Sequence, residues 1–234
     1  MKERIRSFWA LAARNALPWT LRIGLVMTIA EPVLFRLLGW QVSRLEFAVS
    51  ESKLSLVFTL AMAGLCAALC LGGLLRVRDD LPLQRLRLGR NGAFWILAGE
   101  NASCFLILWA WQTVLAIVLA LWWASGHANL TGAHTLFVTS YRVRLLHALL
   151  PLGDWLLWAR NIVMILALGM TTAKAALTRH VTGPLVAGLL GANLWPASTE
   201  SFAYIGLIIQ ILFFLFVAWF AWDVGKRGAG NAQI

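Results

Sequence analysis

Four polar or ionisable residues inside apolar stretches of this sequence are the first candidates for chemistry. Glu31 stands twelve residues into a stretch that begins at residue 19, and Arg160 stands five residues into one that begins at 155. At 1.5 Å per residue they lie about 18 Å and about 8 Å along their helices, in the outer half of a bilayer. Intramembrane charges usually face the protein interior and pair. We therefore predict a Glu31–Arg160 contact, which either only positions helices or belongs to a substrate site. Glu100 and Asn101 lie nearer the inner end of a longer stretch, where water can still reach them.

A compact basic loop at residues 76–92 is the second candidate. It alternates arginine with leucine and leads directly into a long apolar stretch. Such a loop either sets topology through lipid headgroups or docks a soluble partner, with leucines filling a groove and arginines orienting the contact. The residues that would make the docking contact are Arg78, Leu83, Arg85, Leu86, Arg87 and Arg90.

A stripe of small residues is the third feature. Gly64, Ala68 and Gly72 recur every four positions. Small residues at this spacing let two membrane helices approach closely. The stripe predicts helix packing, either within the chain or at the seam of a dimer.

Several common active-site motifs are missing from the sequence. It contains no GxxxxGK[ST], GxSxG or HExxH pattern, so we expect no nucleotide site of the Walker A type and no catalytic or metal site on this chain. The cysteine spacing fits neither a zinc site nor a redox pair, so we predict buried packing residues at Cys66, Cys70 and Cys104.

Composition explains why the candidates must sit on helices in a membrane. Hydrophobic residues make up 60% of the 234, the mean hydropathy is +0.76, and only 13% are charged, whereas soluble domains have about a quarter charged. Several apolar stretches reach the length of about 20 residues that crosses a bilayer. Their backbones must satisfy their own hydrogen bonds, which requires helices. We predict an all-α polytopic protein with one membrane domain over residues 1–234.

Six spans account for the apolar stretches, at residues 19–38, 54–75, 94–123, 155–177, 181–196 and 202–222. The fifth is short and rich in glycine and proline, so it is either a broken helix or a re-entrant hairpin. Residues 2–17 predict a basic amphipathic elbow helix in the headgroup plane, after which Pro18 starts a new direction.

Residues 124–154 form the predicted outer segment. Its part 134–150 is apolar enough to be considered as a seventh span, but it includes Arg142, Arg144 and His147, which are costly at mid-bilayer. We therefore expect an amphipathic helix that lies on the outer surface of the membrane.

The distribution of positive charge predicts the topology. With the N-terminus inside, four basic residues fall outside: Arg44, Lys53, Arg142 and Arg144. Thirteen fall inside: Lys2, Arg4, Arg6, Arg14, Arg76, Arg78, Arg85, Arg87, Arg90, Lys174, Arg179, Lys226 and Arg227. This bias is the positive-inside rule, and it places both ends of a cell-membrane protein in the cytoplasm. The net charge of +10 therefore indicates topology and not nucleic-acid binding.

The layout resembles the permeases of ABC-2-type transporters. The closest likeness is Arg85-Leu86-Arg87-Leu88-Gly89-Arg90 leading into Phe94-Trp95, where that family has a basic coupling segment. The runs Glu31-Pro32-Val33-Leu34-Phe35 and Tyr141-Arg142 to Pro151-Leu152 are also similar to small permeases of this type from Gram-positive bacteria.

The resemblance implies a transport subunit without its own ATPase site. Two permease chains, identical or related, would pair and sit on separate subunits that bind ATP and Mg, with residues 76–92 containing the coupling helix. The cargo would be a peptide, lipid or hydrophobic compound that is exported. Two other readings remain open: a non-transporting assembly or sensor protein that docks a cytoplasmic partner, and an intramembrane enzyme.

Overall fold

The computed structural model describes residues 2–78, 90–127, 143–178 and 203–227, and within these ranges all the regular elements are helices. The predicted all-α class is therefore confirmed for the described part of the chain. In chain order the elements are α1 (Lys2–Leu34), the π-helical segment η1 (Phe35–Gly39), α2 (Leu45–Glu51), α3 (Leu54–Arg78), α5 (Arg90–Gly126), α7 (Arg144–Leu149), α8 (Trp155–Thr178) and α10 (Ala203–Arg227).

Three of the long helices are apolar over enough residues to cross a membrane. They are Leu54–Leu71 in α3, Asn91–Gly126 in α5 and Trp155–Leu177 in α8, and α10 adds a shorter apolar stretch, Gly206–Trp222. Large apolar side chains cover the outer faces of the bundle; Leu60 on α3 and Leu212 on α10 are exposed. A soluble protein rarely exposes continuous apolar surface of this kind. The described chain therefore has the features of a membrane protein.

The predicted spans at 54–75, 94–123 and 155–177 each coincide with one of these three helices. The unusual length expected for the third is confirmed: α5 has 37 residues, about 55 Å, which exceeds a hydrocarbon core of about 30 Å. Helix α10 covers the stretch predicted at 202–222. The predicted fifth span, 181–196, lies outside the described residues.

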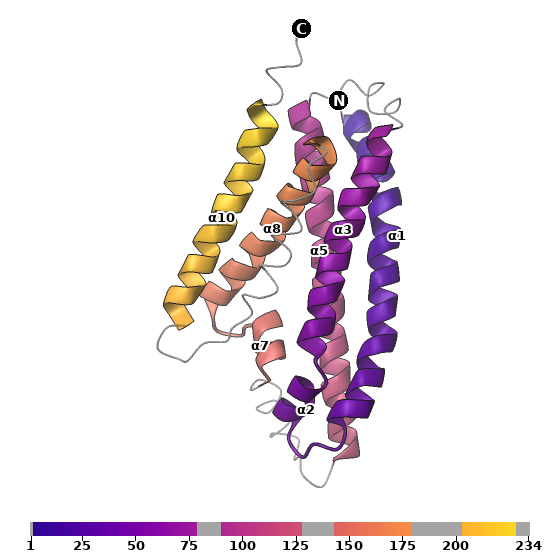
Figure 1. Cartoon of the computed structure of the whole chain (residues 1–234), viewed down its shortest axis with the longest axis vertical. Coiled ribbons are helices and arrows are strands. Elements are labelled where there is room, and N and C mark those ends of the chain that lie inside the picture. Colours follow the sequence, from indigo (N-terminus) through magenta and orange to yellow (C-terminus); the bar gives the residue numbers. More distant parts are fainter. Residues whose placement is uncertain (1, 79–89, 128–142, 179–202, 228–234) are drawn as a thin grey trace.

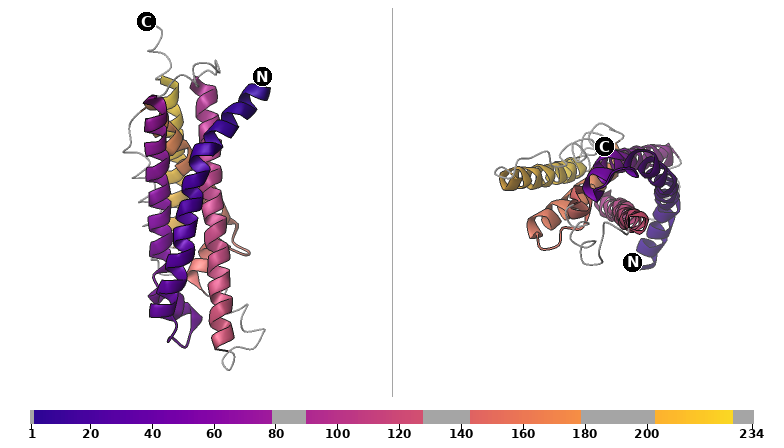
Figure 2. Two further views of the ribbon diagram at one scale, coloured as in Figure 1. Left: turned by 90° about the vertical axis from the view of Figure 1, so that its right-hand side faces the viewer. Right: turned by 90° about the horizontal axis from the view of Figure 1, so that it is seen from below.

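Pro18, where the sequence predicts a new direction of the chain, lies inside a helix and does not end it. Helix α1 continues through both Pro18 and Pro32, and η1 follows directly at Phe35. A proline removes one helical hydrogen bond and bends a long helix without ending it when the turns on either side are intact. Accordingly, the first turns of α1 lean away from the bundle (Figure 2).

The first four long helices, α1, α3, α5 and α8, alternate in direction, and α10 runs the same way as α8. Helices α1 and α5 run the same way, α3 runs opposite to them between these two in sequence, and α8 and α10 run with α3 (Figure 1). The start of α1, the end of α3, the start of α5 and the ends of α8 and α10 therefore share one end of the bundle.

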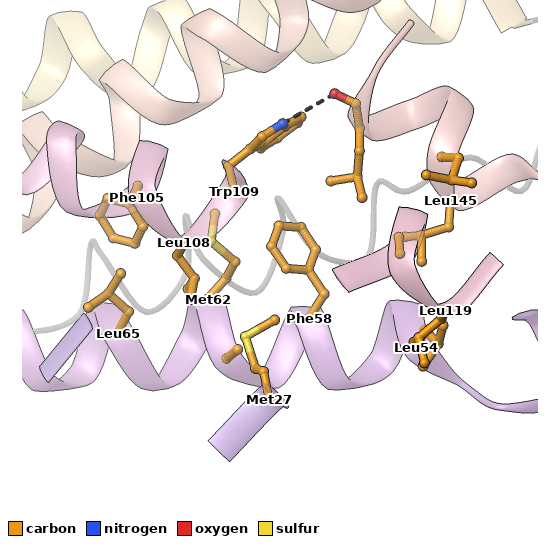
Figure 3. Packing of buried hydrophobic residues seen from close by; sticks show 14 of the residues in the cluster. Met27, Leu54, Phe58, Met62, Leu65, Phe105, Leu108, Trp109, Leu119 and Leu145 are labelled. Atoms are coloured by element: carbon orange, nitrogen blue, oxygen red, sulfur yellow. Dashed lines mark hydrogen bonds between the residues drawn. The ribbon is translucent and has the colours of Figure 1, made fainter. Parts of the chain in front are cut away.

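The main core lies where α1, α3 and α5 meet (Figure 3). Met27, Phe58, Leu65, Phe105 and Leu108 are almost fully buried there. The three cysteines, Cys66, Cys70 and Cys104, are buried and free, which confirms that they are packing residues. This core holds the three helices rigidly enough to position polar groups between them.

Helix α7 covers the last part of the segment 134–150, which the sequence predicts as an amphipathic surface helix. Its six residues are too few to cross a membrane, and the segment 128–142 before it lies outside the described residues. Helix α7 buries Leu145, Leu146, Ala148 and Leu149 within the protein. These four residues are spaced i, i+1, i+3 and i+4 and share one helix face, while Arg144 is exposed, so the short helix is amphipathic.

Candidate functional site

Buried polar side chains inside the bundle form the candidate site. Unpaired polar groups in an apolar interior are costly, and intramembrane polar residues often mark function. Those that the structure buries are Thr20, Glu31, Ser52, Glu100, Asn101, Gln112, Arg160, Asn161, Thr171 and Thr172. Most of them lie on α1, α5 and α8, so the contacts of these three helices define the site.

Glu31 on α1 meets Gln112 on α5. Both side chains are completely buried, and Gln112 Nε2 donates a hydrogen bond of 3.2 Å to Glu31 Oε2. The second carboxyl oxygen, Oε1, and Gln112 Oε1 are buried without a hydrogen-bond partner. The contact therefore places two unsatisfied acceptors on facing helices.

A tryptophan fixes the α1–α5 contact one to two turns away. Trp111 Nε1 donates to Thr28 Oγ1 at 2.9 Å, and a Cβ at Gly24 would lie 3.1 Å from the Trp111 ring. Gly24, Thr28 and Glu31 are spaced i, i+4, i+7, which places them on one helix face. This face sets the register in which Glu31 reaches Gln112.

Helices α5 and α8 share a second polar contact. Asn101 Nδ2 donates to Thr172 Oγ1 at 3.0 Å. The helices come close because position 169 is glycine: a Cβ there would lie 2.7 Å from Ala98 O and 2.8 Å from Ala102 Cβ. Asn101 is buried together with Glu100, so the expectation that water still reaches these two residues is wrong. Thr172 of α8 contacts Asn101.

Arg160 and Asn161 form the third polar group. The Nε and Nη2 atoms of Arg160 donate to Asn161 Oδ1 at 3.1 and 2.7 Å, and Asn161 Nδ2 donates to Ala148 O at 2.9 Å. Trp109 Nε1 donates to Leu149 O at 3.2 Å (Figure 3). Two side chains, one from α5 and one from α8, therefore satisfy carbonyls at the end of α7.

The predicted Glu31–Arg160 pair is not formed. One oxygen of Glu31 accepts from Gln112 and the other has no hydrogen-bond partner, while Arg160 binds the side chain next to it in sequence. Counting residues along α1 and α8 places Glu31 and Arg160 at similar depths in the membrane, but it cannot show which faces of the two helices point toward each other. The sequence reasoning missed Gln112 and Asn161, whose only signal is an amide in an apolar stretch.

The predicted docking residues lie at one end of the bundle or outside the described ranges. Arg78 is the last residue of α3 and Arg90 the first of α5, at the end shared with the start of α1 (Figure 1). Leu83, Arg85, Leu86 and Arg87 fall in the segment 79–89, outside the described residues.

The small-residue stripe opens onto a groove. A Cβ at Gly64 would meet nothing within 4 Å, so no helix of the described chain packs closely there. Gly64 instead lines an apolar groove of about 490 Å³ between α1 and α3. Ala68 is half-buried on the same helix, and Gly72 lies one turn further along it. Only atoms from outside the described residues could therefore pack closely against Gly64.

No protein-family model, curated protein or solved structure matches this chain.

Proposed function

We propose that this chain is the membrane-spanning subunit of an ATP-driven exporter whose nucleotide is hydrolysed by a separate subunit. The observation that carries the proposal is the common location of the basic helix ends. The basic residues placed there by the helices are Lys2, Arg4, Arg6, Arg76, Arg78, Arg90, Lys174, Lys226 and Arg227.

Positive charge at one end orients the bundle in a cell membrane. Basic residues near the ends of spans favour the cytoplasmic side. The other end carries fewer of them, at Arg44, Lys53 and Arg144, and acidic residues at Glu46, Glu51 and Asp154 lie near them in the chain. The N-terminal end of α1 and the C-terminal end of α10 would then both face the cytoplasm, where ATP is available.

The segment between α3 and α5 is the proposed docking element. Arg78 and Arg90 stand at its two ends, at the end of the bundle where the basic helix ends gather. Both flanking helices pack against α1 and α8, so a displacement of this segment by a partner would be passed to the contacts at Glu31 and Asn101. In this proposal the partner subunit holds ATP and Mg, and a second permease chain completes the assembly.

The buried polar residues support transport over an inert membrane anchor. Polar groups on α1, α5 and α8 are buried although each is costly in an apolar interior. A non-transporting protein that docks a cytoplasmic partner is the second candidate, because the same basic end would serve it. The cargo class stays that of the resemblance: a peptide, a lipid or a hydrophobic compound.

Co-purification tests the docking role. The chain is expressed with the product of any adjacent reading frame that encodes a soluble ATPase with a Walker A motif, and the pair is purified through a tag on this chain. We expect the triple change Arg85→Glu, Arg87→Glu and Arg90→Glu to abolish co-purification. The matched control reverses three cations at the opposite end, Arg44→Glu, Lys53→Glu and Arg144→Glu, and keeps the partner bound. An ATPase that binds the first variant as well as the wild type contradicts the docking role.

Reconstituted vesicles separate the two candidates. A transporter complex moves a fluorescent lipid or hydrophobic peptide in an ATP-dependent manner, whereas a docking protein binds its partner and moves nothing. If an active ATPase is bound but no class of cargo moves in an ATP-dependent manner, the chain is the non-transporting protein that docks a cytoplasmic partner.

A further inference from the structure

We propose that Glu31 is a proton-binding site within the bundle, held as a neutral carboxylic acid that forms a doubly hydrogen-bonded acid–amide pair with Gln112. The inference does not depend on the transport function, because it concerns the contact between α1 and α5 alone. The ligand is a single proton taken from water.

The pair lacks one hydrogen. With Glu31 as a carboxylate, Gln112 Nε2 supplies one donor to Oε2 at 3.2 Å. Glu31 Oε1 and Gln112 Oε1 then remain two buried acceptors without a donor. Leaving a buried polar atom unpaired carries its full desolvation penalty, and native proteins avoid it.

No cation offsets a charge on Glu31 in the described part of the chain. Among the side chains that the structure describes, the other ionisable groups on α1, on the elements packed against it and next to their ends are Arg22, Arg36, Lys53, Cys66, Cys70, Glu100, Cys104 and His127. Both arginines are exposed and lie over tryptophan rings instead: Arg22 over Trp19 at 5.0 Å and Arg36 over Trp40 at 4.5 Å. The buried stretch of α3 offers only thiols.

The remaining charged groups are too distant or of the wrong sign. Lys53 is exposed before the start of α3. Glu100 precedes Gln112 by twelve residues on α5, about 18 Å along the helix, and carries negative charge if ionised. A buried carboxylate without a counter-ion is expensive and neutralises instead.

One proton removes both defects. Added to Oε1, it converts the carboxylate to the acid, cancels the charge and makes one of the two unpartnered oxygens a donor. Gln112 Oε1 is the acceptor available to it, and Oε2 continues to accept from Nε2. The proton comes from a hydronium ion of the solvent, whose O–H bond breaks as the O–H bond on Oε1 forms, and no bond between heavy atoms changes. In the ring-shaped acid–amide pair each side chain supplies one donor and one acceptor, and the complete burial of both residues favours this pairing.

Infrared spectroscopy tests the protonation state directly. The protein is reconstituted in phosphatidylcholine vesicles at neutral pH, and the spectrum of Glu31→Gln is subtracted from that of the wild type. We expect the loss of a carbonyl stretching band of a protonated carboxylic acid, which shifts when H₂O is exchanged for D₂O. The control Glu51→Gln removes an exposed carboxyl on α2 and loses a carboxylate band only. Loss of a carboxylate band in Glu31→Gln would overturn the proposal.

A second variant keeps Glu31 and tests the pairing, including the case in which Glu31→Gln does not accumulate in the membrane. In Gln112→Leu the acid loses its amide partner, so we expect its carbonyl band to move to higher frequency. A band that stays at the wild-type position shows that the acid is not bound to Gln112. Absence of any protonated-acid band in both the wild type and Gln112→Leu shows that Glu31 binds no proton.

Discussion

Asn101 on α5 donates a hydrogen bond of 3.0 Å to Thr172 Oγ1 on α8, in the buried contact beside Gly169. The hydroxyl of Thr172 also lies 2.7 Å from Leu168 O in its own helix, so it serves as donor there and as acceptor for Asn101. This hydrogen bond joins the two long helices beside the close approach of their backbones at Gly169.

Removing that acceptor should destabilise the bundle. Thr172→Val keeps the shape of the side chain but leaves the buried Asn101 amide with one bond fewer, which costs about 1–2 kcal/mol. Thermal unfolding in detergent should show a lower midpoint. The control Thr113→Val, which removes a hydroxyl bonded only within its own helix at Trp109 O, should change the midpoint much less. Equal losses in the two variants would mean that the interhelical bond adds nothing.

Glycine at 169 should be required for the close approach of α5 and α8. A Cβ at this position would lie 2.7 Å from a backbone oxygen of α5, so Gly169→Ala forces the helices apart at a cost of about 1–3 kcal/mol. Gly64→Ala is the matched control, because a Cβ there meets nothing within 4 Å and alanine has the higher helix propensity. We expect Gly169→Ala to lower the unfolding midpoint and Gly64→Ala to maintain or raise it.

The Trp109 indole should hold α7 in place. Trp109→Phe keeps most of the buried ring but leaves Leu149 O without its 3.2 Å donor, a loss of about 1 kcal/mol. Hydrogen exchange of the amides in residues 144–149 should become faster, while exchange in the middle of α3 stays unchanged. Trp158→Phe, at a partly exposed ring, provides the comparison. Unchanged exchange in α7 would show that its apolar side chains alone hold it.

Labelling of single cysteines tests the orientation. The variants are made in a background in which the buried cysteines 66, 70 and 104 are replaced by alanine. Lys53→Cys should then react with a membrane-impermeant maleimide in intact cells, because Lys53 is exposed at the end of the bundle opposite the basic helix ends. Arg227→Cys should react only after permeabilisation. The reverse pattern would invert the topology and place the proposed docking segment outside the cell.

Sequence alone determined the class of the protein, the position of its main helices and which helix ends carry the basic residues. Each of these depends on local quantities. An apolar run of sufficient length must become a helix in lipid, because its backbone has no other hydrogen-bond partner. The ends of α3, α5 and α8 accordingly lie within a few residues of the predicted limits. Burial of the three cysteines followed from the same runs.

Tertiary structure decided which side chains meet. Glu31 and Arg160 stand at similar depths, yet Glu31 faces Gln112 and Arg160 folds onto Asn161. Depth follows from residue number, but the facing of a helix depends on how it packs against its neighbours, here through Gly24 against Trp111 and Gly169 against Ala98. Tertiary packing also explains why α1 continues through Pro18, because the packed turns that follow Pro18 stabilise the helix by more than the loss of one hydrogen bond destabilises it.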